Sequence, residues 1–126
     1  MSFKTLGLNN ALLTAIAEQG YDTPSAIQRE AIPTILKRQD VIAIAQTGTG
    51  KTAGFVLPVL QLITEKTTKK NVQALIITPT RELAAQVATS VSNYSAHLNV
   101  SSLAVFGGVR IEPQIDALEQ GVDVLI

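Results

Sequence analysis

The chain has 126 residues, 46% of them hydrophobic, which is enough for the core of one domain at most. Its ten basic and ten acidic residues cancel, so the overall charge excludes a strongly basic protein that binds polyanions through net charge. The sequence has no cysteine, no signal-like N-terminus and no apolar run near the roughly 18 residues of a membrane span, so we expect a cytoplasmic protein without disulfides, cysteine-bound metals or membrane contact.

The N-terminal part of the chain is predicted to be helical. Asn9 is a suitable N-cap for a helix that runs to about Gln19. Thr23, which proline follows, predicts the N-cap of a short helix that runs to about Ala31. Because a proline inside a helix removes a backbone hydrogen bond, we expect Pro33 to begin another short helix.

The rest of the chain alternates between apolar and helix-like segments. Continuous apolar runs predict buried strands, and helical spacing or an N-cap predicts the helices between them. We expect buried strands over residues 41–45, 72–78, 102–106 and 122–126, and helices over residues 51–63 (kinked at Pro58), 80–97 (capped by Thr80) and 112–119. Such alternation is typical of an α/β fold with a parallel sheet. Because the last apolar run has no cap or polar tail, we also expect a truncated piece of a longer protein.

The segment between the first predicted strand and the next helix has the layout of a phosphate-binding loop. Its glycines let backbone N–H groups curl around an anion, and the helix N-terminus adds partial positive charge. Lys51 would reach the β- and γ-phosphates and the Thr52 hydroxyl would ligate Mg²⁺, so these two are the catalytic candidates. The predicted nucleotide-binding residues of this phosphate loop are Gln46, Thr47, Gly48, Thr49, Gly50, Lys51 and Thr52.

Two other interpretations of this segment are weaker. A purely structural turn gives no reason for Lys-Thr at this spacing. The glycines Gly48 and Gly50 with Ala53 also fit a dinucleotide-binding fingerprint, but that fingerprint requires an acidic residue roughly 20 residues further on, where residues 72–74 read Val-Gln-Ala. The phosphate-loop pattern itself normally begins with glycine, and this chain has Ala45 there.

Three further segments accompany the phosphate loop in a fixed order. Residues 20–28 (Gly-Tyr-Asp-Thr-Pro-Ser-Ala-Ile-Gln) precede it, residues 79–83 (Pro-Thr-Arg-Glu-Leu) follow the second strand, and the Gly-Gly pair at 107–108 follows the third. Together they resemble the Q motif, motif Ia and GG motif of the DEAD-box ATP-dependent RNA helicases, whose motif I also begins with alanine. The Gly-Gly-Val-x-x-x-Pro-Gln run resembles the bacterial RhlE-type branch. The resemblance covers essentially the whole chain and implies a RecA-like P-loop NTPase domain with a parallel sheet and flanking helices.

The resemblance implies that ATP and Mg²⁺ are the cofactors and that three residues outside the phosphate loop contact the nucleotide. The Gln28 amide would read the adenine edge, Phe3 would stack on the base, and Tyr21 would belong to the same site. Taken alone, each residue has a structural interpretation. Gln28 completes a capping box with Ser25, a phenylalanine near a terminus is typical of a core residue, and Tyr21 is typical of a packing residue.

The resemblance also implies RNA contacts from Pro79, Thr80 and Arg81 and from Gly107 and Gly108. A hydroxyl, a guanidinium and free N–H groups converge at a predicted helix N-terminus, which suits a phosphate. Contacts to the RNA backbone carry no base information, so sequence-independent binding is expected. The structural alternatives are an N-cap threonine, an exposed arginine and a tight glycine turn. The alternative function is a P-loop ATPase domain without a nucleic-acid partner.

Under this resemblance, residues 1–36 form a Q-motif helical region and residues 37–126 form part of a first RecA-like domain. The Asp-Glu-Ala-Asp and Ser-Ala-Thr motifs are absent. The intact enzyme would couple ATP hydrolysis to RNA duplex unwinding, whereas this chain alone is expected to hydrolyse no ATP. In the family, the strands carrying those motifs lie between the strands expected at 41–45 and 72–78. We therefore expect exposed strand edges and a rearranged or self-associating sheet; no particular protein partner is indicated.

Overall fold

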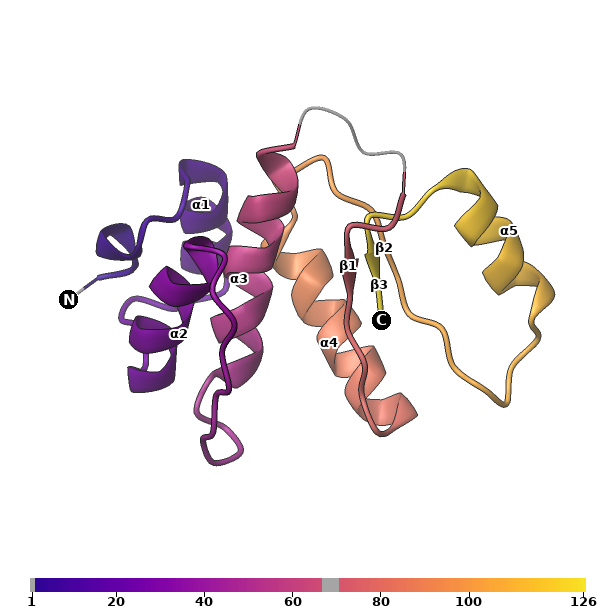
Figure 1. Cartoon of the computed structure of the whole chain (residues 1–126), viewed down its shortest axis with the longest axis horizontal. Helices are drawn as coiled ribbons and strands as arrows, with labels where there is room; N and C mark the ends of the chain where they lie inside the picture. Colours follow the sequence, from indigo (N-terminus) through magenta and orange to yellow (C-terminus); the bar gives the residue numbers. More distant parts are fainter. Residues whose placement is uncertain (1, 67–70) are drawn as a thin grey trace.

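The computed structural model describes residues 2–66 and 71–126, which form a group of helices at one end and a small parallel sheet between α4 and α5 at the other (Figure 1). Its elements are η1 (Phe3–Leu6), α1 (Asn10–Glu18), α2 (Ala26–Leu36), α3 (Lys51–Thr64), β1 (Ala74–Leu75), α4 (Arg81–Tyr94), β2 (Ser102–Leu103), α5 (Glu112–Gln120) and β3 (Val124–Leu125). Helices α1, α2 and α3 gather at one end, α4 lies between α3 and the sheet, and α5 lies beyond the sheet. No helix in these described stretches has the length and apolarity needed to cross a bilayer.

The sheet is parallel, as the sequence predicts, and its strand order is β1-β3-β2. The last strand in sequence therefore lies between the other two, with Val124 paired to Ala74 on one side and to Ser102 on the other. Val124 is 1% exposed, which explains why this segment is uniformly apolar. The ladders are shorter than predicted, because only two residues of each of the expected strands 72–78, 102–106 and 122–126 enter the sheet.

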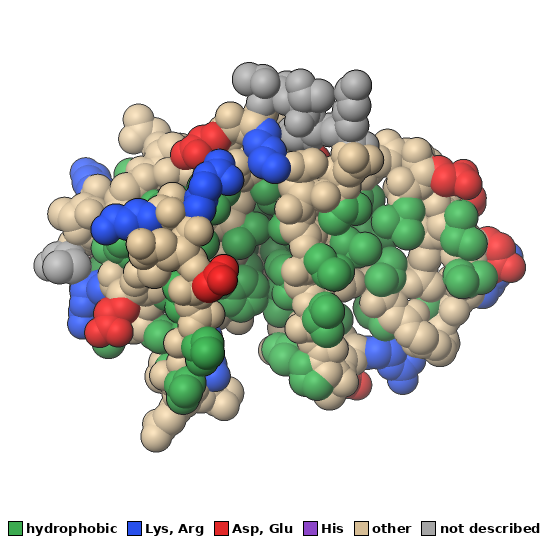
Figure 2. All heavy atoms as spheres, in the orientation of Figure 1, with side chains coloured by type: hydrophobic (Ala, Val, Ile, Leu, Met, Phe, Trp, Pro, Cys, Tyr) green, Lys and Arg blue, Asp and Glu red, His purple; other side chains and the backbone are tan. Residues whose placement is uncertain are grey.

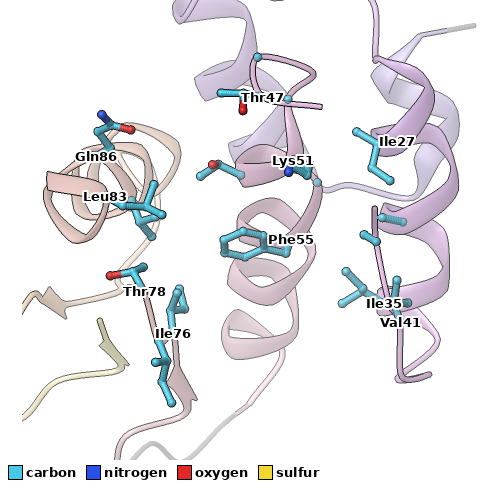
Figure 3. A pocket seen from close by; sticks show the side chains of 18 residues that line it. Ile27, Ile35, Val41, Thr47, Lys51, Phe55, Ile76, Thr78, Leu83 and Gln86 are labelled. Carbon is cyan, nitrogen blue, oxygen red and sulfur yellow. The ribbon is translucent and has the colours of Figure 1, made fainter. Parts of the chain in front are cut away.

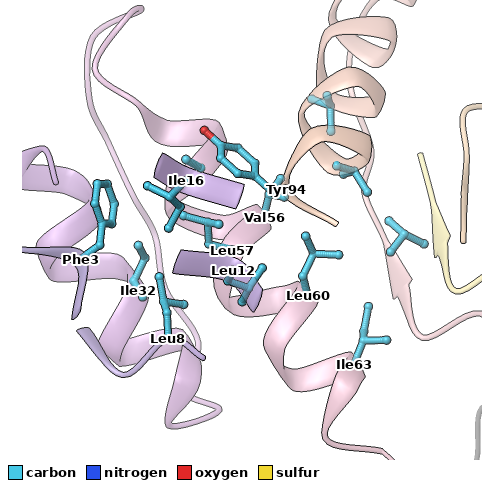
Figure 4. Close-up of a cluster of buried hydrophobic side chains, with 14 of the residues drawn as sticks. Phe3, Leu8, Leu12, Ile16, Ile32, Val56, Leu57, Leu60, Ile63 and Tyr94 are labelled. Atoms are coloured by element: carbon cyan, nitrogen blue, oxygen red, sulfur yellow. The ribbon is translucent and has the colours of Figure 1, made fainter. Parts of the chain in front are cut away.

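Helix α3 is the centre of the hydrophobic core. It contacts α2 and α4, and a helix that is apolar on nearly all sides is typically buried. Leu57 and Leu60 are 0% and 1% exposed, and full burial of each such side chain contributes about 1.5–3 kcal/mol. Figure 4 shows residues of η1, α1, α2 and α4 converging on this helix. The buried residues of α3 are Ala53, Gly54, Val56, Leu57, Pro58, Leu60, Gln61 and Ile63.

One polar side chain of α3 fastens the N-terminal segment to the core. The Gln61 side-chain oxygen accepts the backbone N–H of Asn9 at 2.7 Å, and its amide nitrogen donates to the Gly7 carbonyl at 2.7 Å. Gln61 is only 9% exposed, so both ends of the amide need these partners. The side chain therefore fixes where the segment before α1 lies on α3.

The N-terminal helices confirm one predicted cap and correct two predictions. Asn9 caps α1 by accepting the N–H of Leu12 at 3.0 Å. The prediction of Thr23 as the N-cap of α2 is wrong, because Ser25 is the N-cap. Ser25 and Gln28 form a capping box, in which each side chain accepts the backbone N–H of the other residue. The predicted break at Pro33 is also wrong, since α2 continues through it. Packing of α2 against α3 outweighs the one backbone hydrogen bond that proline removes.

The prediction of a buried strand over residues 41–45 is wrong. This segment joins no sheet, and Ile42 and Ile44 are 92% and 89% exposed. A strand needs a neighbour to pair its backbone N–H and C=O groups. Among the described residues, no backbone hydrogen bond involves residues 41–45. The apolar run is a strand sequence without a partner strand beside it.

Helix α4 begins as predicted and ends early. Thr80 is its N-cap, but the helix stops at Tyr94 instead of continuing to His97, because the chain turns and His97 bonds the Glu18 carboxylate of α1 at 2.9 Å. This exposed pair contributes at most about 1 kcal/mol.

Burial raises the pKa of Tyr94 to about 12, and the nearby Tyr21 hydroxyl adds to the rise.

The backbone just after α2 has a conformation that a glycine would adopt more easily than the arginine present there. Arg38 has φ 61°, a left-handed conformation that costs a non-glycine residue about 1–2 kcal/mol. Glycine adopts it freely, so Arg38→Gly should raise the free energy of unfolding by about 0.5–1 kcal/mol, measured by urea denaturation. Lys37, with φ −80°, is the matched control, and Lys37→Gly should lower stability. Equal destabilisation by both changes would contradict the prediction.

Candidate functional site

Three loops of the predicted site lie at the same edge of the molecule. The phosphate loop before α3, the start of α4 and the loop containing Gly107 and Gly108 all lie at the lower end of Figure 1, where the strands β1 and β2 end. In open α/β folds, ligands bind outside the carboxyl ends of the strands. The fold therefore collects the residues that the sequence singled out at the edge where such sites form.

The phosphate loop has the backbone geometry of an anion-binding turn. Gly48 and Gly50 have φ 83° and 84°, conformations that favour glycine, and Gly50 is the N-cap of α3. The Thr49 hydroxyl closes the turn by donating to the Gln46 carbonyl at 2.6 Å. Lys51 is the first residue of α3 and is exposed. A lysine therefore stands at a helix N-terminus, where an anion is favoured.

Gln28 is bonded to both the capping box and the phosphate loop. Its side-chain oxygen accepts the Ser25 N–H at 2.9 Å, and its amide nitrogen donates to the Gly50 carbonyl at 3.1 Å. The capping-box interpretation is thus confirmed, with Gln28 only 7% exposed. A glutamine amide has two N–H donors and two acceptor lone pairs, so one of each remains for a ligand. Adenine recognition by Gln28 stays a prediction.

The other two residues predicted at the adenine end differ in exposure. Phe3 is 5% exposed and belongs to the hydrophobic core cluster, where Figure 4 shows it beside Ile32 and Leu8. This placement favours the core interpretation, and stacking on a base stays a prediction. Tyr21 is 54% exposed, so its ring has an open surface.

An apolar groove of about 640 Å³ opens beside the phosphate loop. Figure 3 shows Ile76, Thr78 and Leu83 on one side of it, Val41 on the other, and Lys51 and Phe55 of α3 between them. Figure 2 shows the hollow at the lower edge of the molecule, with hydrophobic side chains around it. Thr52 also lines the groove. No group of three His, Cys, Asp or Glu side chains could hold a metal within residues 2–66 and 71–126.

The predicted RNA-binding residues form a second cluster. Thr80 caps α4 by accepting the Leu83 N–H at 3.1 Å, which confirms the structural role of its hydroxyl. Arg81 is exposed at the first position of α4. A side-chain carbon built on Gly108 would lie 2.7 Å from an Arg81 guanidinium nitrogen, so the Gly-Gly loop and Arg81 are in close contact. Pro79 and Gly107 are exposed beside them.

The sequence assigned no site role to two glutamines at this edge, although Gln114 ends the Gly-Gly-Val-x-x-x-Pro-Gln run. Gln86 lines the groove from α4, and Gln114 of α5 bonds the Gly-Gly loop. The sequence shows that these glutamines are present, but their contacts follow only from the folded loop and groove. Gln61 had a detectable signal, since it interrupts the apolar run Leu-Pro-Val-Leu-Gln-Leu-Ile.

Comparison with known proteins gives one family. A family model described as DEAD/DEAH box helicase matches residues 25–126. The ATP-dependent RNA helicase DeaD of Buchnera aphidicola is 45% identical over 127 residues, which is 100% of this chain and 21% of that protein. DeaD of Escherichia coli is 44% identical, over 99% of this chain and 20% of its own length. The chain thus spans about a fifth of the length of these relatives.

Solved structures of similar fold point the same way. A DEAD box protein from the hyperthermophile Methanococcus jannaschii superposes with a TM-score of 0.92 at 37% identity, over 100% of this chain and 34% of that one. The RNA helicase Prp28 from Chaetomium thermophilum, solved bound to ADP, superposes with a TM-score of 0.89 at 38% identity, over 98% of this chain and 31% of that one.

The contact between Gln28 and Gly50 predicts unequal costs for two similar substitutions. Gly48 and Gly50 have nearly the same φ, but a side-chain carbon at Gly48 meets open space, whereas one at Gly50 meets the Gln28 amide. Gly48→Ala should lower the free energy of unfolding by about 1–2 kcal/mol through its conformation alone. Gly50→Ala should lower it further, because the Gln28 bond is also lost.

Urea denaturation of both variants, repeated in a Gln28→Ala background, measures this coupling. We expect most of the extra cost at Gly50 to disappear when Gln28 is alanine, because the nearest remaining atom is the Ser25 hydroxyl oxygen, 3.3 Å from the added carbon. Equal costs at the two glycines, or an extra cost that persists in the Gln28→Ala background, would show that the bond does not order the loop.

Proposed function

Because this chain belongs to the DEAD/DEAH box helicase family, we propose that it is the ATP- and RNA-binding N-terminal part of an ATP-dependent RNA helicase that couples ATP hydrolysis to RNA duplex unwinding. The observation that carries the proposal is the phosphate loop at the start of α3, joined by Gln28 to the preceding helix. Its position at the same edge as Arg81 and Gly108 supports the proposal, because a nucleotide site and a surface that contacts phosphates would then lie on one side of the fold.

ATP is the proposed nucleotide, held at both ends. Lys51 and the N–H groups at the start of α3 would bind the phosphates, and Thr52 would ligate Mg²⁺ together with them. The remaining donor and acceptor of the Gln28 amide would read adenine, whose edge presents one of each. Tyr21 and, after a shift of η1, Phe3 would contact the base. Bound ATP supplies the phosphoryl group for transfer, and these residues bind and orient it.

RNA is the proposed polymer partner, bound through its backbone. The exposed Arg81 guanidinium at the N-terminus of α4 supports this, because phosphates are favoured there. Gly107 and Gly108 have no side chains, so a sugar-phosphate chain can approach their N–H groups closely. Pro79 and Thr80 shape the turn that presents Arg81. Binding of this kind is independent of RNA sequence.

We further propose that the two parts of the chain have different roles, as the motifs indicate. Residues 1–36 would act as the Q-motif region that reads the base, and residues 37–126 as part of a first RecA-like domain. The absence of cysteine supports a cytoplasmic location. The bacterial RhlE-type branch stays the predicted placement within the family.

Self-association through the open groove is the proposed behaviour of this chain by itself. β1 is an edge strand, and Leu75 and Ile77 beside its free edge are 64% and 84% exposed. Across the groove, next to its lining residues Val41 and Ala43, Ile42 and Ile44 are almost fully exposed in a segment with no described backbone partner. Unpaired apolar edges are templates for pairing between chains. We propose that residues 41–45 of one copy pair with β1 of a second copy.

Substitution of Lys51 tests the proposed nucleotide site. Its ammonium stands at the loop where the phosphates would lie, and a hydrogen bond to a charged group is worth about 1.5–3 kcal/mol. Lys51→Ala should therefore weaken ADP and ATP binding by roughly tenfold to a hundredfold in calorimetry. Lys66, exposed just after the other end of α3, is the matched control, and Lys66→Ala should leave affinity unchanged. Equal affinities for all three proteins would refute the site.

Substitution at the free edge of β1 tests the proposed association. Sedimentation equilibrium of the chain should give an average mass above that of one copy that rises with concentration. Ile77→Lys should shift the chain toward monomer, because a charge at a strand edge opposes pairing. Ile111, 62% exposed on the far side of the sheet, is the control, and Ile111→Lys should have no effect. A monomeric chain at high concentration would overturn the proposal.

A further inference from the structure

The loop between β2 and α5 is closed by one side chain. The Gln114 side-chain oxygen accepts the backbone N–H of Phe106 at 3.1 Å, and its amide nitrogen donates to the Arg110 carbonyl at 3.0 Å. An N–H needs an acceptor and a carbonyl needs a donor, so only one orientation of the amide satisfies both. The two bonded residues flank Gly107 and Gly108, so Gln114 connects the two ends of the segment that contains the Gly-Gly pair.

Other described contacts hold this loop weakly. Phe106 packs against the core at the start of the loop, but Val109 and Ile111 are 52% and 62% exposed, so little hydrophobic packing fixes the loop beyond Phe106. Ile111 occupies the N-cap position of α5 without a capping side chain. Gly108 has φ 80°, and glycines restrict the backbone less than other residues. The loop's conformation therefore depends strongly on the two Gln114 hydrogen bonds.

This loop lies against Arg81. The close approach between Gly108 and the Arg81 guanidinium leaves no room for a side chain at residue 108. If the loop moves, the N–H groups of the Gly-Gly pair move relative to Arg81. The relative placement of these two groups decides whether one phosphate chain can contact both.

We propose that Gln114 is a positioning residue for RNA binding: it holds the Gly107-Gly108 loop where the loop and Arg81 contact the same RNA backbone. This inference rests on the proposed function, because it takes RNA as the ligand of that cluster. It adds a residue that touches no RNA itself and acts through the loop whose ends it connects.

The test compares two identical substitutions on α5. Gln114→Met keeps a side chain of similar length and removes both hydrogen bonds. Gln120→Met, at the exposed last residue of the same helix, is the matched control. Fluorescence anisotropy with a labelled single-stranded oligouridine should show RNA affinity reduced roughly three- to tenfold by Gln114→Met. This is the effect expected when the net contribution of about one hydrogen bond that orders the loop is lost. Gln120→Met should leave it unchanged.

Two further readouts separate positioning from general damage. ADP affinity should be the same in both variants, because the phosphate loop lies on other elements. Amide exchange at Phe106 should be faster in Gln114→Met. Unchanged RNA affinity, unchanged Phe106 exchange, or an equal loss of ADP and RNA binding would each overturn the inference. If the unsubstituted chain binds ADP but no RNA, the RNA part of the proposed function fails and this inference fails with it. Intact RNA binding by Gln114→Met overturns the inference alone.

Discussion

The hydrogen bond from the Gln28 amide to the Gly50 carbonyl, 3.1 Å long, joins the two ends of the proposed nucleotide site. Gly50 is the N-cap of α3 and Gln28 lies in the first turn of α2, so one contact orders both the phosphate loop and the side chain that would read the base. Gln61 fastens the other half of α3 to the N-terminal segment. Among the described residues, these two glutamines are the buried polar side chains, and both tie the N-terminal region to α3.

The edge of the molecule at which α3 and α4 begin determines which ligands the site can bind. α3 and α4 begin at the same edge, so their N-termini present two sites of partial positive charge, each with a cation at its first position: Lys51 and Arg81. Between them lies an apolar groove instead of a continuous sheet. The charged loops suit phosphate-bearing ligands, while the apolar walls suit another strand. One part of the chain therefore supports ligand binding and another supports association.

Local sequence patterns correctly predicted the features that depend on neighbouring residues in the chain. The glycine turn before Lys51, the caps at Asn9 and Thr80 and the parallel alternation of strands and helices depend on neighbouring residues, and all are present. The strand expected at residues 41–45 failed because a strand requires a partner that no local pattern supplies. The bonds of Gln61 and Gln114 could not be predicted, because their partners are fixed only by the packed fold.

We propose that a nucleotide bound at the phosphate loop also contacts the Gln28 side chain. A titration of the labelled chain with Mg²⁺–ADP, followed in a two-dimensional amide NMR spectrum, tests it directly, because the backbone N–H signals of Gly48, Gly50 and Lys51 and the side-chain NH₂ of Gln28 are all visible. Because one nucleotide would contact both groups, these signals should shift together and saturate with one dissociation constant. Shifts confined to the loop, with the Gln28 side-chain signals unmoved, would contradict it.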